Sequence, residues 1–259
     1  MTKRLDEFLT KIRAADNTKR AYKNTLTQFV RMYGHMPESS EQSQEYIAHR
    51  ESLGLMPATI GLDVAALIRY LRWEGIPTNR MERMPVVLKT PEYLNKDEIK
   101  RLLGGCESLV SESMVALLYD AGARISEILN IRIVDIDWNG FLFVTRKGGR
   151  QEWANVSEWG MGYLAKWMDV RKGKHPKVYG YRQYIDMYHL LKLAARRAGR
   201  DKFTPHMLRH SRAVHLRQEG LSWEEIGYQL GHTNPTITVK YYTRPDQYDL
   251  KKVVPPVSL

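Results

Sequence analysis

The chain has little cysteine and no long apolar run, and each of these absences excludes some classes of protein. It has 259 residues and a single cysteine, Cys106, which excludes an intramolecular disulfide and a cysteine-based zinc site. No stretch resembles the roughly 18 consecutive apolar residues of a membrane helix. The first residues turn acidic at Asp6 and Glu7 and form no apolar signal core. We therefore expect a cytoplasmic protein that does not engage a membrane.

Acidic side chains are also in deficit. The chain holds 40 Lys and Arg against 29 Asp and Glu, which gives a net charge of +11 at pH 7. The excess is spread over both halves, with 14 basic and 10 acidic residues in 1–90, and 26 and 19 in 91–259. A polyanion contacted by both halves explains this distribution, and nucleic acid is the obvious candidate. An ordinary basic cytosolic protein would show the same totals, so charge alone does not decide.

The first eighty residues predict a small all-α domain. Apolar residues recur at helical spacing from Leu5, and again in a second helix that Asn17 and Thr18 are expected to cap. A polar helix is expected from about residue 38 to 52, and Pro57 is expected to begin a fourth helix.

A change in composition then marks a boundary between two domains. Three prolines lie among basic residues between positions 77 and 91, which indicates an extended basic linker. A surface loop within one domain is the alternative. We expect a helical DNA-binding domain over residues 1–84, a linker over 85–93 and a second domain over 94–259.

The second half predicts a mixed domain in which strands are few. Asn95 is expected to begin a helix, and another helix is expected over residues 112–119. Residues 141–144 and 152–156 are expected to form two strands of a hairpin. The sequence after these strands predicts helices only. The expected fold is therefore mainly α with a small β-sheet, an α+β chain.

One arginine stands where a helix is expected to begin. Arg124 follows a turn at Gly122, and apolar residues at helical spacing come after it. An arginine at this end opposes the helix dipole unless it meets an anion that is drawn to the same place. Glu127, one turn further on, is placed to hold the guanidinium. The plain alternative is an exposed arginine that merely pairs with Glu127.

The expected hairpin carries a lysine at its tip. Lys147 precedes Gly148 and Gly149, so the turn offers little to shield it. Such a lysine can reach into a groove and meet a phosphate or a leaving oxygen. Hairpin tips also carry Lys and Gly for solubility alone, and this residue taken singly is a weak signal.

A segment near residue 206 combines two imidazoles with a guanidinium. His206 and Arg209 are three positions apart, so they share one face of a helix, and His210 follows. An imidazole moves protons, and a guanidinium holds the non-bridging oxygens of a phosphodiester. A zinc site at His206 and His210 is the alternative, but no glutamate follows His206 as the His-Glu-x-x-His pattern requires. We expect no metal here, and a structural or DNA-facing role for His210 and His215.

The last quarter adds a third imidazole and two phenols. Ser222 and Glu225 predict a capped helix that ends just before His232. Tyr241 and Tyr242 follow His232 by nine and ten residues. A phenol beside guanidinium and imidazole groups is suited to attack on a phosphodiester. Two alternatives stand beside this one: a helix-turn-helix in this region, and two tyrosines that simply pack.

The order and spacing of these motifs resemble those of the tyrosine recombinase (phage integrase) family, in its Xer-like form. The matching pieces are Gly-x-Arg-Ile-Ser-Glu-x-Leu from Gly122, the hairpin lysine, His-x-x-Arg-His, Leu-Gly-His and a tyrosine. As a set they are specific, and they cover residues 122–244. The N-terminal helices match the family in architecture only. The resemblance implies an all-α core-binding domain followed by a mixed α/β catalytic domain.

The resemblance implies how the phosphate is held. Arg124 and Arg209 would clamp the scissile phosphate, and His232 would donate a hydrogen bond to it. Glu127 would act as a supporting carboxylate beside Arg124. These cationic and donor groups replace the metal ion that other phosphodiester chemistry uses, so no metal, nucleotide or other cofactor is expected.

The resemblance also implies how protons move and which group attacks. His206 would accept the proton of the tyrosine, and Lys147 would protonate the leaving 5′-hydroxyl. The tyrosine would form a 3′-phosphotyrosyl bond. A nine-residue spacing from His232 selects Tyr241, whereas a ten-residue spacing and the following Thr-Arg favour Tyr242. We take Tyr242 as the nucleophile and keep Tyr241 as the alternative.

The expected function is site-specific recombination of double-stranded DNA, with strand exchange through a Holliday junction. The resemblance implies a homotetramer on paired sites and a dimer or monomer free in solution. Two other functions stay open on the sequence. A type IB topoisomerase-like enzyme would use the same chemistry to relax DNA without site choice. A helix-turn-helix regulator would bind DNA without cutting it.

Overall fold

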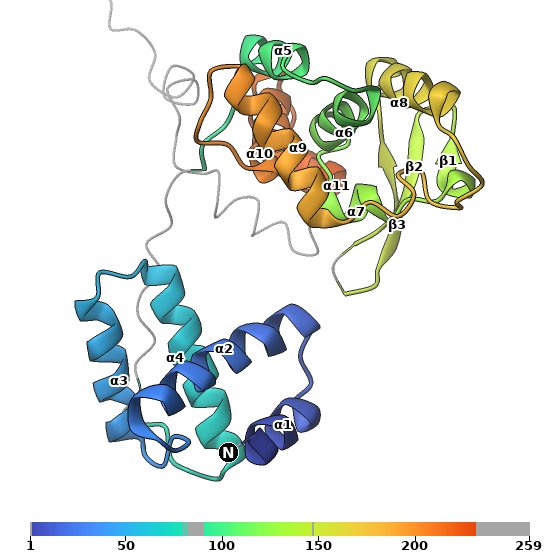
Figure 1. The fold of residues 1–259 in the computed structure, drawn as a ribbon. Helices are drawn as coiled ribbons and strands as arrows, with labels where there is room; N and C mark the ends of the chain where they lie inside the picture. The colour runs from blue at the N-terminus through green and yellow to red at the C-terminus, as the bar shows by residue number, and fades with distance from the viewer. Residues whose placement is uncertain (1, 80, 82–90, 147, 232–259) are drawn as a thin grey trace, which may run out of the picture. The chain divides into compact units, whose positions relative to one another are not determined.

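The computed structural model describes residues 2–79, 81, 91–146 and 148–231 (Figure 1). The chain divides into two compact units, Met1–Leu88 and Lys89–Leu259, and each has a hydrophobic core of its own. Most of the expected linker lies outside the described residues. None of the described helices is long and apolar enough to cross a membrane.

Helices alone make up the described part of the N-terminal unit: α1 (Thr2–Lys11), α2 (Asp16–Tyr33), α3 (Ser40–Ser52) and α4 (Pro57–Trp73). The expected start of the fourth helix at Pro57 is confirmed. The expected cap at Asn17 and Thr18 was wrong, since α2 already begins at Asp16 after an extended Ala15. An acidic side chain in the first turn suits the positive end of the helix dipole, and Asp16 fills that place.

A buried carboxylate fixes how three of these helices pack. Asp63 of α4 is 3% exposed. It accepts a hydrogen bond from Thr25 Oγ1 of α2 at 2.6 Å, and Arg50 Nε of α3 donates to it at 3.0 Å. A buried charge left without partners is strongly destabilising, so α2, α3 and α4 are stable together only in the arrangement that satisfies Asp63.

The second unit contains helices and a small sheet at one side of them (Figure 1), and the expected α+β class is confirmed. Its elements in chain order are α5 (Lys96–Gly104), α6 (Leu109–Asp120), α7 (Ile125–Leu129), the 3-10 helix η1 (Ile133–Asp135), β1 (Ile136–Asp137), β2 (Phe141–Thr145), β3 (Gln151–Asn155), α8 (Glu158–Val170), α9 (Tyr184–Arg197), α10 (Pro205–Gln218) and α11 (Trp223–Leu230). Helix α6 lies at the centre. Its apolar side chains, such as Met114 and Leu118, are buried on all sides, as expected of a helix that is apolar all round.

The sheet is antiparallel with strand order β1-β2-β3. The expected hairpin is present, with its strands within a residue of the expected bounds, and the two-residue β1 was not expected. Leu142 and Val144 of β2 and Ala154 of β3 face the core, and Phe143 and Trp153 pair on the other face. This alternation fixes the register of the hairpin and therefore where its two ends lie.

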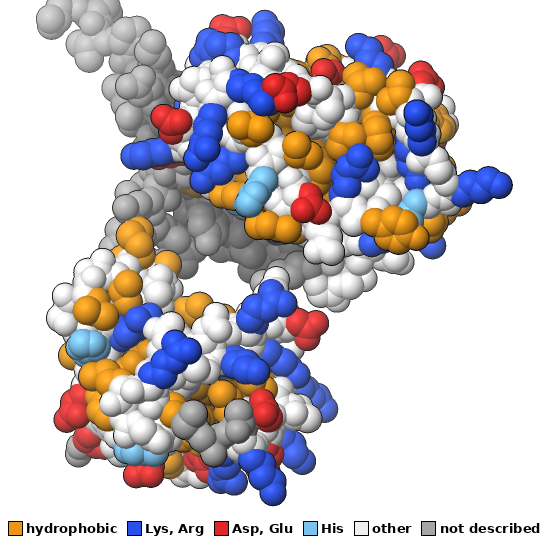
Figure 2. All heavy atoms as spheres, in the orientation of Figure 1, with side chains coloured by type: hydrophobic (Ala, Val, Ile, Leu, Met, Phe, Trp, Pro, Cys, Tyr) orange, Lys and Arg blue, Asp and Glu red, His pale blue; other side chains and the backbone are white. Residues whose placement is uncertain are grey.

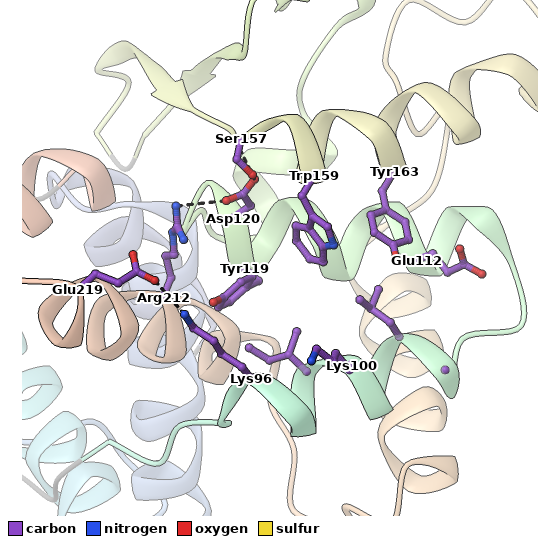
Figure 3. Close-up of a pocket in the computed structure, with 13 residues that line it drawn as sticks. Lys96, Lys100, Glu112, Tyr119, Asp120, Ser157, Trp159, Tyr163, Arg212 and Glu219 are labelled. Atoms are coloured by element: carbon purple, nitrogen blue, oxygen red, sulfur yellow. Dashed lines mark hydrogen bonds and ion pairs between the residues drawn. The ribbon is translucent and has the colours of Figure 1, made fainter.

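Asp120, the last residue of α6, joins three helices (Figure 3). It is 2% exposed. Its Oδ2 accepts hydrogen bonds from the backbone N and the Oγ of Ser157, at 2.8 and 2.6 Å, where α8 begins. Arg212 Nη2 of α10 lies 3.2 Å from its Oδ1. Because α10 carries the His-x-x-Arg-His motif and the turn after Asp120 leads to Arg124, this carboxylate helps to set the distance between the two motifs.

Replacing Asp120 with alanine is expected to lower the free energy of unfolding by about 3 kcal/mol, because the partly buried guanidinium of Arg212 and the backbone N–H of Ser157 lose their partner. Urea unfolding followed by circular dichroism measures the change. Asp97→Ala is the matched control. Asp97 pairs with Lys100 at 3.4 Å and its side chain is 77% exposed, so a change within about 0.5 kcal/mol is expected. Equal effects of the two variants would contradict this account of Asp120.

Candidate active site

Arg124 is the residue immediately before α7. Its backbone is extended, with φ −84° and ψ 150°, and the turn before it is made by Gly122 with φ +59°. A Cβ added at Gly122 would lie 2.5 Å from Leu230 Cδ2, so both the backbone angle and the packing of α11 require glycine here. This turn delivers the guanidinium of Arg124 to the N-terminal end of α7, where an anion is favoured.

Glu127 holds Arg124 in place. Its Oε1 accepts from Arg124 Nη1 at 2.6 Å, and its Oε2 accepts from the backbone N of Arg124 at 2.9 Å. The Glu127 side chain is 3% exposed, whereas that of Arg124 is 33% exposed. Burial acts to raise the pKa of the Glu127 carboxyl, but hydrogen bonds from Arg124 and the charges of Arg146 and Arg124 outweigh it and lower that pKa. Glu127 is therefore ionised, and Arg124 keeps an open side for a ligand.

Arg209 links α10 to the turn that precedes Arg124. It is 2% exposed, and its Nη1 donates to the carbonyl oxygen of Gly122 at 2.7 Å. A guanidinium is delocalised and presents several donors in a plane, which makes it the cation best suited to a buried position. The contact brings two arginines that are far apart in the sequence to one region of the fold.

His206 completes the group that the described residues bring together. It lies one turn before Arg209 on α10, and its ring meets that of His210 edge-on with centroids 4.6 Å apart. Burial of the ring and the charges of Arg209 and Arg124 lower the pKa of His206 to about 4, with Glu127 opposing them. The residue as a whole still has surface open to solvent. The imidazole is therefore neutral at pH 7 and accessible from outside.

His215, by contrast, is a structural residue. It is 2% exposed, and its Nδ1 lies 2.9 Å from the hydroxyl of Tyr119 on α6. Burial lowers the pKa of His215. Of the two roles that the sequence left open for it, packing within the core is the one that the structure supports.

The remaining expected residues, Lys147, His232, Tyr241 and Tyr242, lie outside the described residues. Gly231 is described, and it directly precedes His232 in the sequence. Gly231 ends α11 with φ +67°, and Arg150 Nη2 donates to its carbonyl oxygen at 3.0 Å. The end of α11 is thereby attached to the hairpin.

Two further residues lie at this place that were not expected from the sequence, Arg146 and Glu152. Arg146 is 4% exposed, and it donates to Glu127 at 2.7 Å and to Glu152 at 2.8 Å. The run Arg-Lys-Gly-Gly-Arg is typical of a solvated turn, so its composition does not indicate burial. The one feature of the sequence that could have indicated burial of Arg146 is a carboxylate able to pair with it, Glu127, which is 19 residues away.

A separate hollow of about 580 Å³ lies among α5, α6, α8 and α10, lined by residues that include Lys96, Tyr119, Trp159, Tyr163 and Arg212 (Figure 3). Of the expected site residues that the structure describes, Arg124, Glu127, His206 and Arg209, none lines it. Among the residues that the structure describes, no group of three or more His, Cys, Asp or Glu side chains is placed to hold a metal ion.

The chain is similar to known proteins over nearly its whole length. Residues 92–248 match the model of the phage integrase family. Tyrosine recombinase XerA of Pyrococcus furiosus is 30% identical over 98% of this chain and 94% of its own length. Tyrosine recombinase XerA of Pyrococcus horikoshii is 25% identical over 98% of this chain and 93% of its own length.

Solved structures show the same fold. A XerH site-specific recombinase bound to a palindromic difH substrate superposes with a TM-score of 0.75 and 19% identity, over 91% of this chain and 78% of that one. A lambda integrase tetramer bound to a Holliday junction gives a TM-score of 0.75 and 16% identity, over 93% and 75%. The chain belongs to the phage integrase family of tyrosine recombinases, enzymes that cut and rejoin DNA at specific sites.

The pKa of His206 is open to direct measurement. We expect its Cε1–H resonance, identified by its absence in His206→Gln, to titrate with a midpoint of about 4. In Arg124→Ala the midpoint is expected to rise, because a neighbouring positive charge is gone, whereas Lys100→Ala leaves it unchanged. A wild-type midpoint near 6.5 would contradict the environment described.

A depressed histidine pKa also has a consequence for stability. The unfolded chain binds a proton at this residue near pH 6.5, and the folded chain binds it only near pH 4. The contribution of the neutral imidazole is therefore fully present above pH 6.5 and declines as the pH falls from 6.5 towards 4.

Proposed function

We propose that this recombinase cuts each DNA strand with a tyrosine, holds the strand end as a 3′-phosphotyrosine, and exchanges strands through a Holliday junction. The observation that carries the proposal is the meeting of Arg124, which precedes α7, with His206 and Arg209 of α10. Two guanidiniums and a neutral imidazole together suit a phosphodiester that is attacked by a hydroxyl.

The two arginines act on the phosphate. During attack, negative charge builds up on the non-bridging oxygens, and donors that are already in place stabilise it at no further cost of reorganisation. Arg124 offers a third of its side-chain surface to a ligand, and Glu127 keeps it aimed. Arg209 is fixed by the carbonyl of Gly122. We assign both to the clamp, with His232 as a further donor.

Proton transfer falls to His206 and Lys147. A phenol with a pKa near 10 is a poor nucleophile at pH 7 unless a base accepts its proton. His206 is neutral and able to accept, and a bound phosphate would raise its proton affinity through its negative charge. Lys147 would give a proton to the 5′-oxygen as the bond between that oxygen and phosphorus breaks. The phosphotyrosyl bond then keeps the energy of the original linkage for rejoining, so no nucleotide is consumed.

Duplex DNA is the partner that fits both units. The end of α1 and the start of α2 carry Lys11, Arg13, Lys19, Arg20 and Lys23. Lys and Arg side chains also gather on this part of the N-terminal unit in Figure 2. We therefore assign residues 1–84 to core binding, 85–93 to the linker and 94–259 to catalysis. A DNA-acting enzyme of this kind would work in the cytoplasm.

Assembly on DNA follows from strand exchange. Two duplexes with two cleavage sites each need four active sites, and the lambda integrase structure is a tetramer on a Holliday junction. We propose a homotetramer on paired sites that forms from dimers or monomers. The two other functions that the sequence left open, topoisomerase and non-cutting regulator, are not favoured by the family membership. Relaxation of supercoiled plasmids that lack any selected site would instead support the topoisomerase function.

The nucleophile is tested by two separate substitutions. Tyr242→Phe is expected to abolish covalent protein–DNA adducts on a nicked suicide substrate, because the attacking oxygen is removed. Tyr241→Phe is expected to retain adduct formation within about tenfold. The substrate carries a site enriched from random DNA by binding. The reverse pattern assigns Tyr241, and adducts in both variants, or in their double substitution, would overturn a tyrosine nucleophile at this position.

Metal and nucleotide independence is a further expected outcome. Adduct formation and plasmid recombination by the wild type are expected to proceed at full rate in EDTA and without ATP, since cationic side chains do the work of a metal. A DNA-cutting metalloenzyme treated in parallel serves as the control. Complete loss of cleavage in EDTA, restored by Mg²⁺, would refute this mechanism.

A further inference from the structure

A buried arginine at the end of β2 joins three segments of the site. The side chain of Arg146 is 2% exposed. Its Nη1 donates to Glu127 Oε2 at 2.7 Å and its Nε to Glu152 Oε1 at 2.8 Å. Its backbone N donates to the carbonyl oxygen of Arg150 at 2.7 Å, which closes the hairpin. No step of the chemistry described above uses this residue.

Glu127 is shared between two guanidiniums. One oxygen binds Arg124 Nη1 at 2.6 Å, and the other binds Arg146 Nη1 at 2.7 Å. Oε2 also accepts from the backbone N of Arg124 at 2.9 Å, so Arg146 adds a second, charged donor to that oxygen. This donor holds the carboxylate from a segment other than α7, and it thereby restricts the direction in which Glu127 presents the guanidinium of Arg124.

The same arginine supports the end of α11. A Cβ added at Gly231 would lie 2.4 Å from Nε and 2.8 Å from Cζ of Arg146. The backbone of Gly231 therefore packs directly against the guanidinium of Arg146 and the carboxylate of Glu152, and Arg150 donates to its carbonyl oxygen. Lys147 follows Arg146 in the sequence and His232 follows Gly231. One buried side chain thus contacts Glu127, the hairpin and the residue that precedes His232.

Charge also matters. The cluster of Arg124, Arg146 and Arg150 with Glu127 and Glu152 holds three guanidiniums and two carboxylates. Its formal net charge is one positive unit, and Arg124 is the member that carries it towards a ligand. Without Arg146 the cluster would be neutral, and Glu127 would neutralise Arg124 alone. Because that neutralised arginine attracts an anion less, the stabilisation of a phosphate would fall.

We propose that Arg146 is a positioning residue for DNA cleavage, which acts through Glu127 to aim Arg124 at the scissile phosphate and to keep its positive charge available. The inference rests on the role proposed for Arg124. Arg146 itself does not contact the phosphate, since its side chain is buried against Glu127, Glu152 and Gly231.

Single-turnover cleavage of two substrates tests the inference. The first is the nicked suicide substrate with an ordinary scissile phosphodiester. The second carries a methylphosphonate at that linkage, which lacks one negatively charged oxygen. Arg146→Met is expected to cleave the first substrate about 100-fold more slowly than the wild type. On the second substrate the loss is expected to shrink to below about tenfold, because less charge has to be stabilised. An equal loss on both substrates, with normal DNA binding, would mean that Arg146 is merely structural.

A conservative substitution keeps the test valid if Arg146→Met unfolds at the assay temperature. Arg146→Lys retains the charge but cannot bind Glu127 and Glu152 together in one plane. It is expected to be about tenfold slower on the phosphodiester and close to the wild type on the methylphosphonate. Wild-type rates on both substrates, or the same loss on both, would overturn the inference.

Two controls separate this inference from the function it rests on. Arg124→Ala is expected to show the same dependence on substrate, with a larger loss of about 1,000-fold on the phosphodiester. Arg197→Met removes an arginine whose pair with Glu107 is solvent-exposed, and no change is expected. If Arg124→Ala cleaves the phosphodiester normally, the proposed clamp fails. If Arg124→Ala shows the pattern and Arg146→Met does not, only the role of Arg146 fails.

Discussion

The arrangement of the second unit depends on one buried carboxylate. Glu127 is 3% exposed and still ionised. Because water cannot hydrate this buried carboxylate, positively charged partners have to stabilise it. It receives them from Arg124, one turn earlier, and from Arg146 at the end of β2. These contacts attach α7 to the hairpin, and the turn before α7 is attached to α10 by Arg209. The segments that carry the expected chemistry are therefore held together by pairing of charge as well as by apolar packing.

Positive groups that are placed together to bind a phosphate repel one another, and this repulsion destabilises the fold as long as no phosphate is bound. Burial of the His206 ring, together with the nearby charges of Arg209 and Arg124, lowers the pKa of the imidazole to about 4. The fold limits the repulsion by setting Glu127 against one arginine and the carbonyl of Gly122 against the other, while the histidine stays neutral. In the proposed mechanism, what remains is a net attraction for an anion, and His206 as a base whose proton affinity rises once that anion is bound. The positive groups that repel one another before binding would therefore stabilise the bound phosphate.

The sequence predicted what local rules and motif spacing decide. The helix starts at Asn95, with its capping box to Glu98, and at Pro57 are of this kind, as are the hairpin and the shared helix face of His206 and Arg209. It failed where a distant partner or a close competitor decides. Helix α2 begins at Asp16, so Asn17 lies inside its first turn and does not cap it. Arg146 looked like a solvated turn residue, and only the fold reveals that a carboxylate 19 residues away and the backbone of Gly231 cover it.

Two glycines show why side-chain pairing alone does not explain the site. Gly122 and Gly231 both have left-handed backbones, and an added Cβ would collide with Leu230 at the first and with Arg146 and Glu152 at the second. Leu230 and Gly231 are consecutive at the end of α11, so one end of one helix packs on both the turn that precedes Arg124 and the guanidinium that holds Glu127. The approach is closer than any side chain permits. Steric fit at these glycines therefore determines where α11 ends relative to the arginines, and charge pairing determines how the arginines point.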